Sequence, residues 1–462
     1  MAVQQIVSPI DQSIVAERVT VTPAELDGVL ARAAAARDAW RATPVAERIA
    51  IVEAMVQVLE ADADAIAVEL ARQMGRPVRY GAGEIRGGFQ ERARRMCSLA
   101  EASLADVAVA APDEFRKFLR RDPLGTVLVV APWNYPFLCA VNSVVPALLA
   151  GNTVVLKHAT QTLLVGDRLA GAFASAGLPA GVFQHVVATH DDVAAMIGDP
   201  RVDFVAFTGS VAGGHTIAAQ AGQRFIGTGL ELGGKDPAYV RADADLSLTV
   251  ADTVDGAFFN SGQSCCAIER IYVHEHVHDE FVDRFAAATR ALVLGDPLDH
   301  ATTIGPMVRT RAADAVRAQI AQALAAGATP LVSEADFPAA ATGTPYVGPT
   351  VLVGVDHSMR VMREESFGPV IGIMKVSGDD EAIALMNDSD YGLTASVWTA
   401  DDDAAIDIGD QIATGTVYAN RCDYVDPSLV WTGVKDSGRG QALSHLGFEP
   451  FTRLKSFHLR QR

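Results

Sequence analysis

The segment Thr126–Lys157 reads TVLVVAPWNYPFLCAVNSVVPALLAGNTVVLK, and it decides the class of fold. Its two ends, Thr126–Ala131 and Thr153–Lys157, are short apolar runs rich in β-branched residues, and Pro136–Leu149 between them is a helical stretch. A strand, a helix and a second strand in this order are typical of a βαβ unit, whose parallel strands are buried on both faces. The segment therefore predicts an α/β fold.

The same alternation continues toward the C-terminus. Further helices are expected over 163–176, 191–197 and 211–221, and further strands over 183–187, 204–208 and 224–230. A second alternating section, from about 236 to 434, has expected strands at 270–273, 350–353, 370–375, 395–398 and 416–419. Two such sections indicate parallel sheets covered by helices.

The two ends of the chain differ from this pattern. Residues 24–75 and 84–104 carry apolar side chains at helical spacing among Ala, Arg and Glu, so they are expected to be helical. Residues 115–121 alternate between apolar and basic side chains, and the tail 451–459 alternates again. We expect these two segments to pair as edge or intersubunit strands.

Length and composition exclude several classes of protein. A chain of 462 residues that is 49% hydrophobic has material for roughly three domains. Its net charge of −18 argues against a nucleic-acid or anionic-membrane binder, because phosphates require clustered positive charge. Five cysteines, an odd and small number, indicate a reducing compartment. No signal peptide or bilayer-spanning stretch is evident, so a cytoplasmic location is expected.

A second informative segment, Phe258–Cys266, reads FFNSGQSCC and places two cysteines in a turn of small residues. A nucleophilic thiol needs a nearby base, which activates either the thiol or a water that attacks its acyl intermediate. Glu231 is a suitable base because it stands alone between apolar residues, and burial raises the pKa of a carboxyl toward neutrality. The alternative is that either cysteine is an inert core residue.

Three features at predicted strand ends are candidates for ligand binding. Residues 207–214 read FTGSVAGG, and glycines there let backbone amides approach a pyrophosphate at a helix N-terminus. Lys157 ends a strand of the same sheet, where it would hold a ribose or a phosphate. Asn134 lies in a turn flanked by prolines, where its amide suits an oxyanion. The alternatives are structural turns and a solvated lysine.

Residues 274–278 read HEHVH, a pattern that invites comparison with metal sites. The run follows a predicted strand and precedes a polar helix start, which favours a solvated edge. The adjacent Cys265 and Cys266 do not suit one ion, and the chain has no second cysteine pair. We therefore expect no metal centre.

Taken together, these segments resemble the aldehyde dehydrogenase superfamily, and within it the bacterial NAD(P)-dependent enzymes of the succinate-semialdehyde type. The likeness covers nearly the whole chain, and the motifs come in the family's order. They are segments 132–136, 151–153, 207–210, 231–235, 258–266, 364–369, 387–393 and 433–440.

The resemblance implies a three-part subunit and an oligomer. A Rossmann-like cofactor domain would comprise residues 1–112 and 126–232, and a catalytic α/β domain residues 233–434. Residues 113–125 and 435–462 would form a small oligomerisation β-arm. Members of the family are dimers or tetramers, so a homodimer or homotetramer is expected, with a small aldehyde as the only other partner.

The resemblance also assigns roles to residues. Cys265, and not Cys266, matches the nucleophile that forms a thiohemiacetal and then a thioester. Asn134 and the Cys265 backbone amide would hold the oxyanion, and Glu231 would activate the hydrolytic water. The implied cofactor is NAD or NADP. The residues expected to bind it are Trp133, Lys157, Thr160, Thr208, Gly209, Ser210, Gly214, Leu232, Glu365 and Phe367.

Some positions depart from the family pattern. Thr160 stands where many NAD-specific members carry a carboxylate, so NADP is expected to be accepted. Asn142 and Phe259 stand where succinate-semialdehyde enzymes often place arginines. Residues expected to line the substrate tunnel are Tyr135, Phe259, Tyr424 and Trp431. Aliphatic or aromatic aldehydes are therefore the expected substrates, with succinate semialdehyde or a related semialdehyde as the alternative.

Three rival activities are weighed against oxidation to an acid. A CoA-acylating dehydrogenase commonly lacks the base, so Glu231 argues against it. A non-redox cysteine hydrolase or acyltransferase needs a histidine partner, and no histidine lies in such a motif. A non-enzymatic structural relative is disfavoured because Cys265, Glu231 and Asn134 are all retained.

Overall fold

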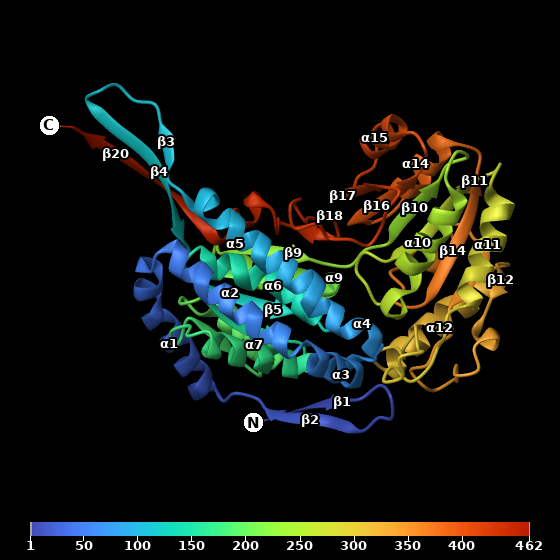
Figure 1. Ribbon diagram of the computed structural model, residues 1–462, viewed down its shortest axis with the longest axis horizontal. Coiled ribbons are helices and arrows are strands. Elements are labelled where there is room, and N and C mark those ends of the chain that lie inside the picture. The colour runs from blue at the N-terminus through green and yellow to red at the C-terminus, as the bar shows by residue number, and fades with distance from the viewer. Residues whose placement is uncertain (1, 462) are drawn as a thin grey trace.

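The computed structural model describes residues 2–461 as two large helix-covered sheets and a projecting β-arm, which is the α/β architecture that the sequence predicts (Figure 1). The first sheet has the strand order β19-β9-β8-β5-β6-β7, and it is parallel except for β19. Its strands are β5 (Thr126–Ala131), β6 (Thr153–His158), β7 (Phe183–His185), β8 (Phe204–Thr208), β9 (Gly227–Glu231) and β19 (Gly438–Arg439).

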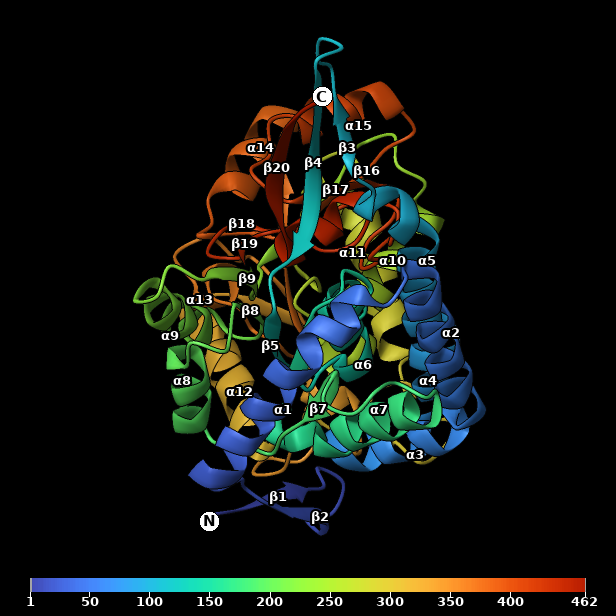
Figure 2. The ribbon, with the colours of Figure 1, turned by 90° about the vertical axis from the view of Figure 1, so that its left-hand side faces the viewer.

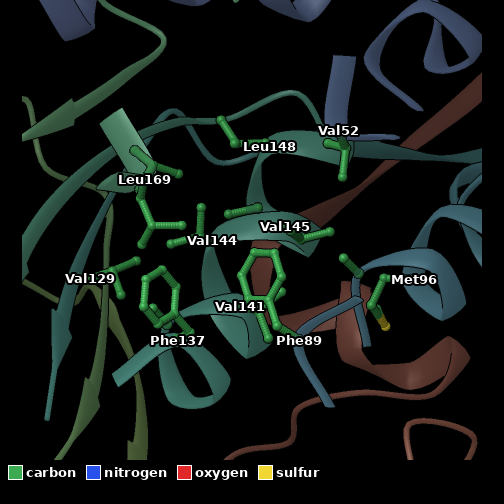
Figure 3. Close-up of a cluster of buried hydrophobic side chains, with 14 of the residues drawn as sticks. Val52, Phe89, Met96, Val129, Phe137, Val141, Val144, Val145, Leu148 and Leu169 are labelled. Atoms are coloured by element: carbon green, nitrogen blue, oxygen red, sulfur yellow. The ribbon is translucent and has the colours of Figure 1, made fainter. Parts of the chain in front are cut away.

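Alternate residues of β5 contact different layers of helices. Val127 and Val129 belong to the cluster formed with α2, α5, α6 and α7, part of which is shown in Figure 3, whereas Leu128 packs with α1, α8 and α9. Each fully buried side chain of this size stabilises the fold by about 1.5–3 kcal/mol. The helices are α1 (Pro23–Ala42), α2 (Val45–Ala61), α5 (Gln90–Leu104), α6 (Pro136–Leu149), α7 (Leu163–Ser175), α8 (His190–Gly198) and α9 (Val211–Gly222).

The second sheet has the order β12-β13-β14-β11-β10-β16-β17 and is parallel except for β12. Its strands are β10 (Asp236–Val240), β11 (Ile268–His274), β12 (Thr329–Val332), β13 (Thr350–Val353), β14 (Val370–Val376), β16 (Thr394–Trp398) and β17 (Thr416–Ala419). The helices of this half are α10 (Leu246–Phe258), α11 (His278–Arg290), α12 (Thr310–Ala325), α13 (Arg360–Arg363), α14 (Asp379–Asn387) and α15 (Asp402–Gly409).

The arm consists of β3 (Val107–Val109), β4 (Phe115–Pro123) and β20 (Thr452–Arg460), and it extends away from both sheets (Figure 1), with β4 between β20 and β3 (Figure 2). The predicted pairing of the tail with residues 115–121 is confirmed, with Phe118 opposite Phe457 in an antiparallel register. The two rings stack with centroids 4.5 Å apart. Such cross-strand aromatic pairs stabilise a ribbon that has little core of its own.

Strand β19 joins the C-terminal segment to the first sheet. It pairs with β9, so that Gly438 lies opposite Glu231. Gly438 has φ 119°, and a Cβ there would lie 2.0 Å from the Leu230 carbonyl oxygen, so only glycine fits. The outer edge of β9, the strand that carries Glu231, is therefore hydrogen-bonded to residues that come about two hundred positions later in the chain.

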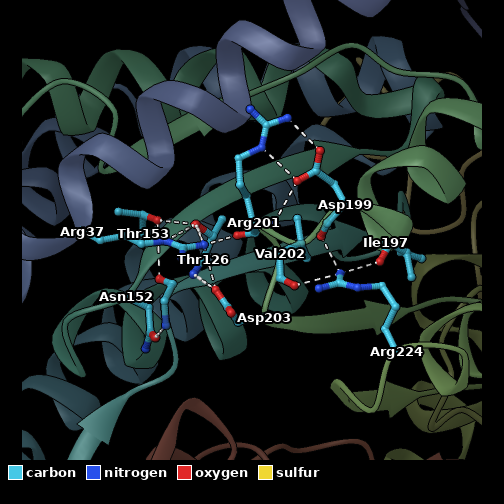
Figure 4. Close-up of polar contacts among 11 residues, drawn as sticks. Arg37, Thr126, Asn152, Thr153, Ile197, Asp199, Arg201, Val202, Asp203 and Arg224 are labelled. Carbon is cyan, nitrogen blue, oxygen red and sulfur yellow. Dashed lines mark hydrogen bonds and ion pairs between the residues drawn. The ribbon is translucent and has the colours of Figure 1, made fainter.

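Several elements differ from the sequence prediction. The N-terminal hairpin of β1 (Val3–Val7) and β2 (Ile14–Val19) was not predicted, and neither were β10 and α10. The strand expected from residue 224 begins at Gly227, because Arg224 donates from its side chain to the carbonyls of Ile197 and Val202 and so belongs to the preceding loop (Figure 4). No helix within residues 2–461 is long and apolar enough to cross a membrane.

Candidate active site

Two cavities meet between the sheets, and three residues border both of them. The larger has a volume of about 380 Å³ and the smaller about 270 Å³. The shared residues are Thr208, Glu231 and Cys265. A thiol and a carboxyl thus stand at the junction of two chambers, each large enough for part of a ligand.

The loop that carries Cys265 has an unusual backbone. Asn260, Ser261 and Gly262 have φ values of 54°, 60° and 68°, which is the left-handed region that costs non-glycine residues about 1–3 kcal/mol each. The buried side-chain amide of Gln263 holds this turn in its conformation. The Gln263 side chain donates to the Asn260 carbonyl at 3.1 Å and accepts from the Val308 backbone at 2.8 Å. The surrounding structure therefore holds the thiol in place.

Asn134 follows β5 and is buried beside this loop. Its side-chain Nδ2 donates to the Gln263 carbonyl at 3.2 Å, and its own carbonyl accepts from Asn260 Nδ2 at 3.3 Å. The amide expected to hold an oxyanion therefore lies against the loop of the expected nucleophile, although the two come from different halves of the chain.

A buried ion pair that the sequence did not indicate supports Asn134. Arg76 pairs with Glu84 and also donates to the Asn134 carbonyl. Glu84 Oε1 accepts from the backbone amides of Phe137 and Leu138 at 2.8 and 3.2 Å, where a carboxylate suits the N-terminus of α6. The guanidinium of Arg76 lies 4.6 Å from the centroid of the Tyr135 ring. Arg76 lies in a short link between two helices and Glu84 in a helical stretch, and neither position carries a sign in the sequence that it is buried, so sequence reasoning missed both.

Glu231 ends β9 in a low-dielectric position. Burial raises the pKa of its carboxyl to about 7, against the lowering effect of the Arg92 charge and of a hydrogen bond from Thr208 Oγ1 at 3.3 Å. A carboxyl with this pKa is partly ionised at neutral pH, which is the condition for a general base.

Cys266 borders only the larger cavity and has a different environment. Its Sγ donates to Asp423 Oδ1 at 2.9 Å. Contact with the Cys265 thiol, burial and the Asp423 carboxylate together raise the pKa of Cys266 well above its ordinary value. Cys266 is therefore a protonated, buried thiol.

The smaller cavity is lined by most of the residues expected to bind the cofactor. Those among the predicted set are Trp133, Thr208, Gly209, Ser210, Leu232, Glu365 and Phe367. Ser210 caps α9 by accepting from the Gly213 amide at 3.2 Å. Gly214 lies outside the cavity, and a Cβ on it would come within 2.6 Å of Leu232, so it allows close packing of α9.

Glu365 lies on a turn that is held from behind by a second carboxylate. Gly234 donates to Glu365 Oε1 at 3.0 Å, and burial raises the pKa of Glu365 to about 8. Glu269 accepts from the amides of Ser366 and Phe367 at 2.7 and 2.9 Å, and it pairs with Lys235 at 2.6 Å. Glu269 is a further residue that sequence reasoning missed.

Lys157 and Thr160 lie near the carboxyl end of β6, away from both cavities. Lys157 is only 7% exposed, burial lowers its pKa, and it forms no hydrogen bond or ion pair with other residues in 2–461. Thr160 Oγ1 donates to Gln4 Oε1, from β1, at 3.0 Å. A buried lysine side chain without a partner, at the same carboxyl edge of the parallel sheet as the capped end of α9, fits the ribose and phosphates of a dinucleotide.

The larger cavity contains all four residues expected in the substrate tunnel, namely Tyr135, Phe259, Tyr424 and Trp431. It also contains ionisable side chains that were not predicted, namely Glu91, Arg92, Asp255 and Asp423. Tyr424 donates to Glu91 at 2.8 Å. The wall of the larger cavity therefore carries charged as well as aromatic side chains. Within residues 2–461, no group of three or more His, Cys, Asp or Glu side chains is placed to hold a metal ion.

The fold and the site together define a class of protein. A thiol, a carboxyl of near-neutral pKa and a buried amide meet at the inner end of a cavity suited to a dinucleotide, which describes a nicotinamide-dependent dehydrogenase with a cysteine nucleophile. Comparison with known proteins agrees. The profile of the aldehyde dehydrogenase family matches residues 2–457, and the chain belongs to this family. It is an NAD(P)-dependent oxidoreductase that acts on aldehydes.

The relatives include enzymes with a named substrate. An aldehyde dehydrogenase of Paenarthrobacter nicotinovorans is 39% identical, with 94% of this chain and 95% of that protein covered. A succinate semialdehyde dehydrogenase [NAD(P)+] of Escherichia coli is 34% identical, with 94% and 92% covered. The crystal structure of succinic semialdehyde dehydrogenase from Streptococcus pyogenes, in complex with NADP+, matches with a TM-score of 0.94 at 29% identity, covering 99% and 100% of the two chains.

Proposed function

We propose that Cys265 is the nucleophile that attacks the aldehyde carbon and that Glu231 is the base for the hydrolytic step. The observation that carries this proposal is their joint position at the border of both cavities. An aldehyde in the larger cavity and a cofactor in the smaller one would meet at the thiol, which forms a thiohemiacetal. A nicotinamide dinucleotide supplies the hydride acceptor, and removal of the hydride leaves a thioester on Cys265.

Asn134 and Glu231 complete the cycle. The two N–H groups of the Asn134 side chain include one that contacts the Gln263 carbonyl, and the other can donate to the oxygen of the tetrahedral species together with the Cys265 backbone amide. The pKa of Glu231, about 7, lets its carboxylate remove a proton from water, which then cleaves the thioester. The products are a carboxylic acid and the free thiol.

The cofactor residues are assigned by their positions. Lys157 would hold the adenosine ribose, Ser210 and the N-terminus of α9 the pyrophosphate, and Glu365 the nicotinamide ribose. Trp133 and Phe367, whose ring centroids are 5.7 Å apart, form an aromatic wall of this cavity. Thr160 brings no negative charge to the 2′ position, which supports acceptance of NADP beside NAD.

We further propose that residues 1–112 and 126–232 bind the cofactor, that 233–434 form the catalytic part, and that 113–125 and 435–462 mediate assembly into a homodimer or homotetramer. The arm supports this because Leu454 and Leu459 are 61% and 45% exposed on it, on an edge strand. All five cysteines are unpaired thiols, which suits a reducing, cytoplasmic location.

The decisive experiment follows reduced cofactor by absorbance with an aldehyde and either dinucleotide. Wild-type protein is expected to reduce the cofactor, and Cys265→Ala is expected to abolish the reaction while leaving the fold intact. Cys266→Ala is the matched control, because it removes the neighbouring thiol, and it should keep most of the activity. Turnover by Cys265→Ala at the wild-type rate would refute the assignment.

The residues around the thiol and the names of the relatives support two different classes of substrate. The aromatic residues Tyr135, Phe259 and Trp431 support the aliphatic or aromatic aldehydes expected from the sequence. The names of several relatives support succinate semialdehyde. The charged side chains of the larger cavity, and above all Arg92, bear directly on this choice.

A further inference from the structure

Arg92 of α5 is an arginine enclosed in the larger cavity, together with Cys265 and Glu231. Its side chain is held from one end only, since the same terminal nitrogen donates to the Leu138 carbonyl at 3.0 Å and to Asn142 Oδ1 at 3.2 Å. The residue is 8% exposed. Both contacts orient the guanidinium, and neither neutralises it.

Among residues 2–461, Arg92 has no carboxylate within ion-pair distance, and its Nε and second terminal nitrogen have no hydrogen-bond partner. Burying a cation without a counter-charge costs several kcal/mol, so a protein retains it where a ligand provides the charge. The planar guanidinium offers two parallel N–H groups that match both oxygens of a carboxylate.

None of the acidic side chains of the cavity lies within ion-pair distance of Arg92, although its charge opposes, from farther away, the rise in the pKa of Glu231, the proposed base, and of Asp423. Asp423 accepts hydrogen bonds from Cys266 and Ser264, at 2.9 and 3.3 Å. Glu91 and Asp255 are solvent-exposed, and Glu91 accepts from Tyr424. Exposed charges act through water of high dielectric constant and are screened by salt, so they repel an anion bound deeper inside only weakly.

We propose that Arg92 binds a carboxylate at the far end of the substrate, so that the enzyme prefers aldehydes bearing a carboxylate over uncharged ones. This inference rests on the proposed function of Cys265. Asn142, whose lack of charge argued against acidic substrates, here positions an arginine supplied by a different helix. The expectation of apolar substrates rested on the absence of arginine at positions 142 and 259 and on the aromatic residues of the tunnel, whereas Arg92 brings a cation to the same cavity from another helix.

The test compares two substrates of the same shape, succinate semialdehyde and 4-methylpentanal, in which an isopropyl group replaces the carboxylate. Wild-type protein should have the higher kcat/KM with succinate semialdehyde. Arg92→Met should lower that value about 10- to 100-fold more than the value for 4-methylpentanal, which should fall only as far as the loss of the Arg92 charge raises the pKa of Glu231. Arg95→Met, an exposed arginine on the same helix, is the matched control and should change neither value. Equal losses for both substrates would overturn the proposal.

A second measurement does not depend on turnover. Succinate, which has the carboxylate but no aldehyde, should bind wild-type and Cys265→Ala protein in calorimetry, and Arg92→Met should weaken this binding at least 10-fold. The double variant Arg92→Met/Asn142→Arg moves the positive charge from α5 to α6, and it should recover part of the preference for succinate semialdehyde. Wild-type protein that favours 4-methylpentanal and does not bind succinate refutes the inference but leaves Cys265 chemistry intact. Wild-type protein that oxidises neither aldehyde refutes the proposed function itself.

Discussion

Asn134 Nδ2 donates to the carbonyl oxygen of Gln263 at 3.2 Å, which ties the end of β5 to the loop that carries Cys265. The bond spans 129 positions of sequence and both halves of the fold. It means that the expected oxyanion donor and the expected nucleophile move as one unit, so the geometry of one fixes that of the other.

Substitution of Asn134 should therefore affect catalysis more than stability. Asn134→Ala is expected to lower kcat about 10²- to 10³-fold, which is the usual loss for a single oxyanion donor. Steady-state kinetics measure this, with the thermal unfolding midpoint as the check on folding. A loss below threefold would show that Asn134 does not contact the reacting oxygen.

The pH dependence of the reaction should follow Glu231. Its pKa of about 7 means that the carboxylate, which is the active form of a base, becomes populated as the pH rises through neutrality. The deacylation rate should rise up to about pH 7 and then level off. Glu231→Gln should release one equivalent of reduced cofactor in a rapid burst and then turn over slowly. A Glu231→Gln variant with the wild-type pH profile would contradict the role of base.

The buried pair of Arg76 and Glu84 should matter for both folding and activity. Arg76→Met leaves Glu84 uncompensated and should lower the free energy of unfolding by about 3–5 kcal/mol. Urea titration measures the change. Arg86→Met, which breaks the exposed pair with Asp64 in the same region, is the control and should cost far less, because water screens exposed charges. A similar loss of unfolding free energy in the two variants would mean that the buried pair stabilises the fold no more than the exposed pair does.

Cofactor preference should respond to position 160. Thr160→Glu places a carboxylate where the 2′-phosphate of NADP is expected, so kcat/KM with NADP should fall about 10- to 100-fold while the value with NAD stays within a few-fold. Thr160→Ser keeps the hydroxyl that donates to Gln4 and is the matched control. Wild-type protein with a strong preference for NAD would speak against acceptance of NADP.

Assembly should depend on the exposed leucines of the arm. Leu454→Glu puts a charge on the face proposed to meet another subunit, and the molar mass from light scattering should fall toward that of one chain. Leu248→Glu, which changes an exposed leucine of α10 outside the arm, is the control and should leave the mass unchanged. A monomeric wild-type protein would contradict the proposed role of the arm.

Sequence patterns predicted the bounds of two strands well. The bounds of the buried β13 and of the half-exposed edge strand β17 agree with the expected ranges, because short runs enriched in β-branched and aromatic residues between polar turns favour strands. The hairpin of β1 and β2 was missed because VQQIV and IVAERV are short and half polar. Helix α10 mixes Thr, Asp and Gly with its apolar residues, so its periodicity is weak.

The residues of the site also divide into those that the sequence predicted and those that it did not. Cys265, Glu231 and Asn134 occur in short motifs, so their meeting could be expected from resemblance. Arg92 and Glu269 act through partners more than 30 positions away, and local sequence contains no record of such contacts. Long-range polar contacts have to be observed in three dimensions.

The pairing of β19 with β9 has a consequence for how the protein is made. Residues 438 and 439 leave the ribosome long after β9, and domains generally fold in the order of synthesis. Until they arrive, the strand that ends in Glu231 has an open edge. A nascent chain or a chain truncated before residue 438 therefore cannot complete the surroundings of its base, and the reactive centre matures only after these two residues have been made.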